Sequence, residues 1–89
     1  MKRREVTLVN RLGLHARAAS KLVQRASEFG AEVWVLRDGR RVNAKSIMGV
    51  LLLAAPCGTE LTLEADGEDA EEALEALAAL IDDRFGEDE

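Results

Sequence analysis

The stretch that decides the fold is residues 32–43, EVWVLRDGRRVN. Its first half, Glu32 to Arg37, is rich in residues that favour β-strands. Asp38-Gly39 follows, and Asp-Gly between two strand-like runs is a strong signal for a tight β-hairpin turn. The chain then runs back through Arg40 to Asn43. The stretch therefore predicts two adjacent antiparallel strands.

The residues before this hairpin predict a strand and a helix. Glu5 to Val9 alternates apolar and polar residues, which indicates a first strand, and Gly13 marks a turn after it. From Ala16 onward the apolar residues recur with a helical period, and Gly30 supplies a C-terminal stop. The apolar stripe of this helix consists of Ala19, Leu22, Val23, Ala26 and Phe29.

The residues after the hairpin predict a short helix and a fourth strand. Ser46 is placed to act as an N-cap for a helix over Ile47 to Leu53, which Gly49 weakens. Gly58 opens a loop, and Glu60 to Ala65 alternates as a strand that ends at Asp66-Gly67.

A last helix is expected from Ala70 to about Phe85. Asp69 and Glu72 before and within its first turn have the spacing of a capping box. The acidic tail, Gly86 to Glu89, is expected to be frayed. The residues that this helix should bury are Ala73, Leu74, Leu77, Leu80 and Ile81.

The predicted order of elements is β-α-β-β-α-β-α. Short connections and one tight hairpin favour an α+β fold, in which a four-stranded, mostly antiparallel sheet is covered on one face by three helices. The length of 89 residues is enough for one core, so we expect a single domain over residues 1–89.

The composition, 47% hydrophobic and 33% charged, is typical of an ordinary globular domain. The longest apolar run, Val50 to Pro56, is too short to span a membrane, and no apolar signal core follows the basic N-terminus. The single cysteine, Cys57, cannot form an internal disulfide. We therefore expect a cytoplasmic protein that does not insert into membranes.

The net charge of −5 conceals an asymmetry. Residues 1–45 carry eleven Lys or Arg and four Asp or Glu, whereas residues 46–89 carry one basic and thirteen acidic residues. A nucleic-acid-binding domain is usually basic overall, which this chain is not. The basic half is better suited to attract an anionic group or an acidic protein surface.

The only histidine, His15, lies where the turn meets the start of the first helix. Free backbone N–H groups at a helix N-terminus stabilise an anion and favour a neutral imidazole, the form able to attack phosphorus. The amides of Ala16 and Arg17 would face a phosphoryl group on the ring, and the Arg17 guanidinium can pair with its oxygens. The sequence contains no nucleotide-binding motif, so donor and acceptor must be other proteins.

Two segments resemble signatures of the HPr family, the histidine-containing phosphocarriers of the bacterial phosphotransferase system. Residues 13–17, GLHAR, resemble the active-site loop, and residues 43–49, NAKSIMG, resemble the segment around a regulatory serine. The resemblance also includes Phe29-Gly30, Gly58 and the Asp66-Gly67 corner, so that it covers the whole chain.

The resemblance implies an open-faced β-sandwich and a phosphohistidine at Nδ1 of His15, with Arg17 stabilising the phosphate. Enzyme I would supply the phosphoryl group and IIA proteins would accept it, so the chain is a carrier and not a self-sufficient enzyme. It implies no cofactor and no metal. It also implies phosphorylation of Ser46 by an HPr serine kinase/phosphorylase, where such an enzyme is present.

The resemblance further implies a docking surface beside His15, on a chain that is expected to be a monomer. An exposed apolar patch would consist of Ile47, Met48 and Leu51. A basic rim around it would consist of Arg11, Arg17, Lys21 and Lys45.

Two alternatives remain open at this point. Ala18 stands where the family usually has proline. An alanine at this position resembles some proteobacterial members, including the nitrogen-related branch (NPr). A regulatory phosphorelay of that branch, without sugar transport, is therefore an alternative. A small-ligand or RNA-binding α+β module is the other. RNA-binding sheets usually display stacking aromatic residues, and this chain has only Phe29, Trp34 and Phe85.

Overall fold

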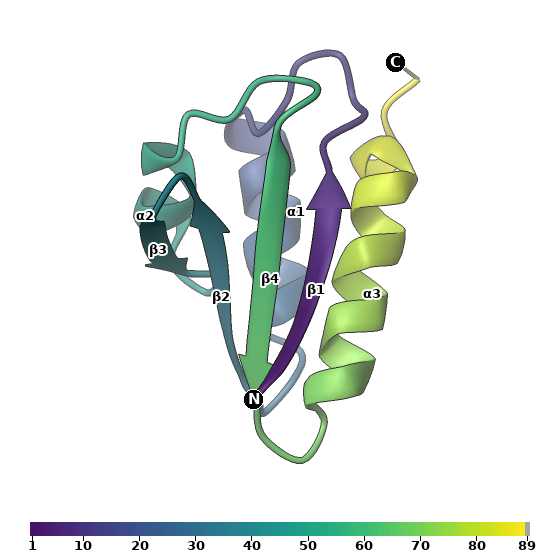
Figure 1. The fold of residues 1–89 in the computed structure, drawn as a ribbon. Coiled ribbons are helices and arrows are strands. Elements are labelled where there is room, and N and C mark those ends of the chain that lie inside the picture. Colours follow the sequence, from purple (N-terminus) through teal and green to yellow (C-terminus); the bar gives the residue numbers. More distant parts are fainter. Residues whose placement is uncertain (89) are drawn as a thin grey trace.

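A computed structural model describes residues 1–88 and has the predicted order of elements. Figure 1 shows the sheet in front and the helices behind and beside it. The α+β prediction is therefore confirmed. The elements are β1 (Lys2–Thr7), α1 (Ala16–Ala26), β2 (Glu32–Arg37), β3 (Arg40–Asn43), α2 (Ile47–Leu52), β4 (Glu60–Asp66), α3 (Ala70–Asp82) and a short 3-10 helix, η1 (Arg84–Gly86).

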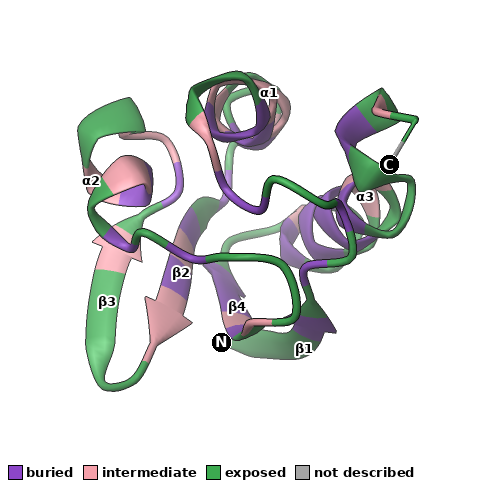
Figure 2. Cartoon of the chain, turned by 90° about the horizontal axis from the view of Figure 1, so that it is seen from above, coloured by how far each residue is buried: buried purple, intermediate pink, exposed green. Residues whose placement is uncertain are grey.

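The sheet has the strand order β1-β4-β2-β3, and each neighbouring pair is antiparallel. Val35 lies at the centre of the register, opposite Val42 on one side and Leu63 on the other. Viewed from above, the helices lie on one side of the sheet, so the sandwich is open on the other side (Figure 2).

The core forms where the inward side chains of the strands meet the small side chains of α1. Val33 and Val35 of β2 are almost completely buried, as are Ala18 and Ala19 of α1. Because alanine projects only a methyl group, α1 can pack closely against α2 and α3, and α3 in turn lies against β1 and β4. The alanine at position 18 is thus part of the core.

The predicted ends of several elements need correction. β1 begins at Lys2 and not at Glu5, because its first residues pair with β4, with Lys2 opposite Ala65. α1 ends at Ala26 and not at Phe29, and the Ser27 hydroxyl donates to the Val23 carbonyl at 2.7 Å.

α3 also ends earlier than predicted. Its last residue is Asp82, because Arg84, Phe85 and Gly86 have φ values of 57°, 55° and 77° and turn the chain away from the helix axis. Leu80 is half-buried, whereas the prediction placed it inside the core.

The predicted capping box at Asp69 is wrong. Asp69 is the N-cap residue of α3, but its side chain makes no capping hydrogen bond. Its carboxylate instead accepts hydrogen bonds from the amides of Gly30 and Ala31, at 2.9 and 2.8 Å. The Gly30 bond, helped by that of Ala31 and opposed by desolvation, holds the pKa of Asp69 below its usual value. Asp69 therefore ties the start of α3 to the loop before β2.

A polar layer covers the open face of the sheet. Glu64 on β4 is 4% exposed and bonds Arg3 of β1 at 2.5 Å and Arg41 of β3 at 3.2 Å. The Arg41 guanidinium also lies 4.0 Å from the ring centroid of Trp34 on β2. The hydrogen bond from Arg3, with further contributions from Arg41, lowers the pKa of Glu64 against the effect of burial. These four residues connect all four strands.

We predict that Asp69→Ala lowers the free energy of unfolding at about pH 7, because two backbone amides lose a charged acceptor. The folded pKa of Asp69 lies below the unfolded value of about 3.9, so its carboxylate stabilises the fold above that value. This stabilisation is lost as the pH falls through the folded pKa. Urea unfolding at about pH 7 and about pH 2.5 should show that the difference between the two proteins shrinks in acid.

Glu68→Ala is the control, because Glu68 is an exposed acid beside Asp69. It should leave the urea midpoint nearly unchanged at both pH values. An Asp69→Ala difference that is the same at both pH values would contradict the prediction.

Candidate functional site

The loop between β1 and α1 is fixed by a buried asparagine and a glycine. Asn10 is fully buried, and its Nδ2 donates to the Gly13 carbonyl at 2.7 Å. Gly13 has φ +66°, and a Cβ there would lie 2.8 Å from Cα of Pro56. The amide of Leu14 then donates to the Ala55 carbonyl at 2.8 Å. The loop is thus pinned against residues 55 and 56 immediately before α1 begins.

His15 is the N-cap of α1, where the sequence places it. Its backbone is extended, with φ −74° and ψ 178°, and its Nδ1 accepts a hydrogen bond from the Arg17 amide at 3.3 Å. The side chain is 26% exposed. Nδ1 therefore lies at the positive end of α1, among the first-turn amides that have no intrahelical partner.

The other ring nitrogen of His15 contacts a residue that the sequence did not indicate. Nε2 hydrogen-bonds Oε2 of Glu87, and Asn10 Nδ2 donates to Oε1 of the same carboxylate at 3.1 Å. Burial of this carboxylate acts to raise its pKa. The hydrogen bonds from Asn10 and His15 outweigh that effect and hold the pKa of Glu87 below its usual range.

The prediction of a frayed tail is therefore wrong for residues 86 and 87, whose amides bond the carbonyls of Asp83 and Arg84, while Glu89 lies outside the described residues. Phe85 is 1% exposed, and its carbonyl accepts a hydrogen bond from the Lys21 ammonium at 2.5 Å. Burial of this ring anchors the chain end beside α1. An aromatic residue at the end of the predicted helix was the only signal in the sequence for this anchoring.

His15 lies in an open hollow of about 640 Å³ at the end of the molecule where β1 joins α1. The guanidinium-bearing side chains of Arg11 and Arg17 line it, as does the apolar side chain of Leu12, which is 65% exposed. The complete lining consists of Arg11, Leu12, His15, Ala16, Arg17, Glu87 and Asp88.

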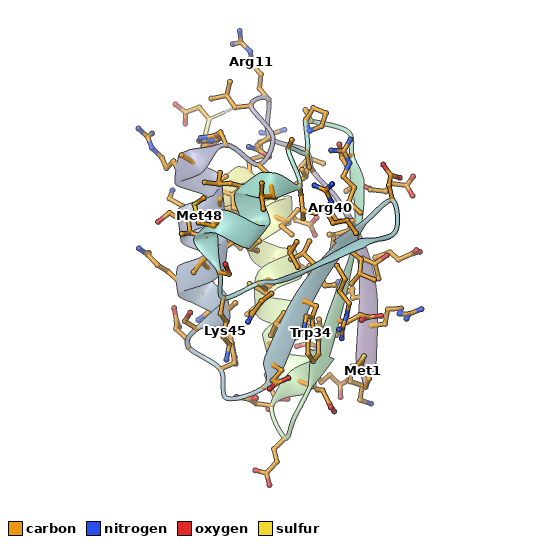
Figure 3. The ribbon with its side chains drawn as sticks, turned by 90° about the vertical axis from the view of Figure 1, so that its left-hand side faces the viewer. Met1, Arg11, Trp34, Arg40, Lys45 and Met48 are labelled. Carbon is orange, nitrogen blue, oxygen red and sulfur yellow. The ribbon has the colours of Figure 1, made fainter. Side chains whose placement is uncertain are left out.

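The expected basic rim is only partly present. Arg11 and Arg17 line the hollow, and the Lys21 ammonium is bonded to the Phe85 carbonyl. Lys45 is elsewhere, because its ammonium donates to the Phe29 carbonyl at 2.8 Å, beyond the C-terminal end of α1. Figure 3 shows Arg11 and Lys45 at well-separated levels of the molecule. The expectation that Lys45 belongs to a rim around His15 is corrected.

Ser46 is the N-cap of α2, as predicted, and its Oγ accepts a hydrogen bond from the Gly49 amide at 3.2 Å. Within α2, Ile47 is 38% and Met48 67% exposed, and Met48 points outward in Figure 3. Leu51 is half-buried against the core, so the expectation of an exposed Leu51 is corrected. Leu52, one helical turn from Met48, is 62% exposed in its place.

Among residues 1–88, no cluster of three or more His, Cys, Asp or Glu side chains is arranged to hold a metal ion. No helix in this part of the chain has the length and apolar character needed to cross a membrane.

Comparison with known proteins agrees with this geometry. Residues 2–83 match the family described as "PTS HPr component phosphorylation site". The chain is 56% identical over 89 residues to the phosphocarrier protein HPr of Cupriavidus necator, with both chains fully covered. It is also 46% identical over 84 residues to the phosphocarrier protein NPr of Shewanella violacea, covering 94% of this chain and 92% of the relative.

Solved structures give the same result. The chain is similar to a crystal structure of HPr from Thermoanaerobacter tengcongensis, with a TM-score of 0.96, 46% identity and full coverage of both chains. A crystal structure described as an HPr dimer from the same organism has a TM-score of 0.79 and 47% identity, covering 98% of this chain and all of the other.

An open-faced sandwich with a histidine at a helix N-terminus, matched along its length by a phosphorylation-site family, defines a phosphocarrier protein. The chain belongs to the HPr family of the phosphotransferase system.

We predict that Gly13→Ala destabilises the protein by about 2–3 kcal/mol, because it adds a backbone collision to the strain of a positive φ. Gly39→Ala is the matched control, since Gly39 has φ +81° but open space around its Cα. It should cost about 1 kcal/mol. Urea unfolding measures both, and equal losses in the two variants would contradict the predicted collision.

Proposed function

We propose that His15 is the residue that carries the phosphoryl group, at Nδ1. The observation that carries this proposal is the orientation of the ring, in which Nδ1 accepts the Arg17 amide at the N-terminus of α1. A nitrogen that accepts a hydrogen bond has its lone pair available. The attacking atom is thus already directed toward the part of the helix that binds anions.

The same surroundings suit the phosphorylated state. Phosphoryl oxygens attached to Nδ1 would face the backbone amides of Ala16 and Arg17 at the positive end of α1. The Arg17 side chain lines the hollow, where its guanidinium can pair with two oxygens and offset charge that develops during transfer.

The donor is phosphorylated enzyme I, and the acceptors are IIA proteins of the phosphotransferase system. The chain works as a cytoplasmic monomer, since a carrier must present one face to successive partners. The surface for these partners is the hollow with its two arginines, together with the exposed side chains of Leu12, Ile47, Met48 and Leu52. Flexible Met48 suits a surface that binds several partners.

Residues 45–49, KSIMG, resemble the sugar-type, kinase-regulated form and favour the sugar-transport branch over the nitrogen-related branch. The alternative rested on Ala18, and Ala18 is fully buried in the core, away from the surface that partners would contact. The alanine is therefore explained by its place in the core, without reference to the branch.

Ser46 is the proposed regulatory site, modified by an HPr serine kinase/phosphorylase. Its hydroxyl caps α2 within two residues of Ile47 and Met48. A phosphate there would place negative charge beside the docking surface, where an acidic partner would be repelled.

The first experiment is intact-mass measurement after incubation with phosphoenolpyruvate and enzyme I. The wild type should gain one acid-labile phosphoryl group of about 80 Da, because Nδ1 is oriented to attack phosphorus. His15→Ala should gain none. A wild type that gains no mass with either a sugar-type or a nitrogen-type enzyme I would overturn the proposed carrier function.

We also predict that Ser46→Asp slows acceptance of the phosphoryl group from enzyme I by about 10-fold, since it adds charge at the docking surface. Ser27→Asp, which places the same charge at the C-terminal end of α1, opposite the end that carries His15, should change the rate much less. The measurement is the initial rate of phosphorylation at about 0.1 M salt, repeated at higher salt, where the Ser46→Asp effect should diminish. Equal effects of the two variants would count against this role of Ser46.

A further inference from the structure

We propose that Glu87 is a positioning residue for phosphoryl transfer: its carboxylate holds the His15 proton on Nε2 and so leaves the Nδ1 lone pair for attack. This inference rests on the proposed function of His15. It concerns a residue 72 positions away in the chain, which reaches the ring only through the turn of residues 84–86.

Two contacts select the same tautomer of His15 from opposite sides of the ring. The Arg17 amide can only donate, so the Nδ1 that it approaches must be without a proton. The Glu87 carboxylate can only accept when ionised, so the Nε2 that it contacts must carry the proton. The hydrogen bond on one nitrogen thereby fixes the state of the other.

The Glu87 carboxylate is itself held in place. Its side chain is 15% exposed, and Asn10 donates to the oxygen that does not face His15. Asn10 cannot turn its amide around freely, because the same Nδ2 also donates to the Gly13 carbonyl. The chain just before Glu87 is anchored by the buried ring of Phe85 and by the hydrogen bond from the Lys21 ammonium to the Phe85 carbonyl. The lowered pKa of Glu87 agrees with an ionised acceptor at neutral pH.

The arrangement also balances the charge that transfer creates. The Nδ1 lone pair forms the new N–P bond, the bond between phosphorus and the donor atom of enzyme I breaks, and its electron pair returns to that donor atom. The proton on Nε2 stays in place, so the His15 ring becomes cationic. Glu87 then lies directly against the new positive charge, and the reverse changes occur when the group leaves for an acceptor.

Replacement of Glu87 by glutamine gives a distinctive expectation. Asn10 Nδ2 would continue to donate to Oε1 of the new amide, which directs the amide nitrogen toward His15. That nitrogen is a donor and requires a lone pair on Nε2, so it shifts the proton toward Nδ1 in opposition to the Arg17 amide, and a proton on Nδ1 blocks attack. Alanine leaves Nε2 to water, so that the Arg17 amide alone selects the tautomer. The variant closer in shape to the wild type should therefore be the slower one.

The experiment compares rates of phosphoryl transfer from phosphorylated enzyme I to the wild type, Glu87→Gln, Glu87→Ala and the control Asp82→Asn. Asp82 is an exposed acid at the end of α3, so its variant loses the same charge and should behave as the wild type. We expect Glu87→Ala to be about 10-fold slower and Glu87→Gln about 100-fold slower.

¹⁵N NMR of the unphosphorylated His15 ring reports which nitrogen carries the proton. A Glu87 that only stabilised the fold would not change this distribution when it is replaced. The wild type should carry the proton on Nε2, and Glu87→Gln should shift population toward a proton on Nδ1. Circular dichroism verifies that each variant is folded.

A Glu87→Gln rate equal to or above that of Glu87→Ala would overturn the inference. A wild-type ring with its proton on Nδ1 would overturn it as well. If the wild type accepts no phosphoryl group, the proposed function fails, and the ¹⁵N result still decides whether Glu87 sets the tautomer.

Discussion

Asn10 is fully buried after β1, and its side-chain amide donates to acceptors in two different parts of the chain. One acceptor, the Gly13 carbonyl, shapes the loop that starts α1. The other, the Glu87 carboxylate, fixes the chain end against the His15 ring. A buried amide without these partners would be destabilising, so the folded state depends on both bonds. The position of His15 depends on this pairing.

Much of the fold could be predicted because its signals are local. The hairpin at Asp38-Gly39 and the caps at His15 and Ser46 are determined by residues within a few positions of each other. The errors arise where distant segments compete. Asp69 had the spacing of a capping residue, but the amides of Gly30 and Ala31 offered it better partners. Pairing with β4 likewise extends β1 back to Lys2, although residues 2–4 are all basic and show no alternation of apolar and polar side chains.

Within the site, too, the residues related by local sequence could be predicted and those brought together from distant segments could not. His15 and Arg17 are two residues apart, and the geometry of one helix turn relates them. Glu87 is brought to the ring by three residues of positive φ and by burial of Phe85, and no sequence pattern encodes that path. Lys45 and Leu51 were misplaced for a related reason, because a family resemblance does not show which way a side chain points. Lys45 bonds the end of α1 and Leu51 packs inward.

The polar layer on the open face of the sheet gives the protein a built-in optical reporter. Trp34 is the one tryptophan of the chain, and its ring lies under the Arg41 guanidinium, well away from the level of Arg11 in Figure 3. Its fluorescence emission should change when the strands separate and the stacked cation leaves. A phosphoryl group on His15 is too remote to alter that contact. Emission from Trp34 can therefore follow folding of the native chain while the chemistry at His15 is under way.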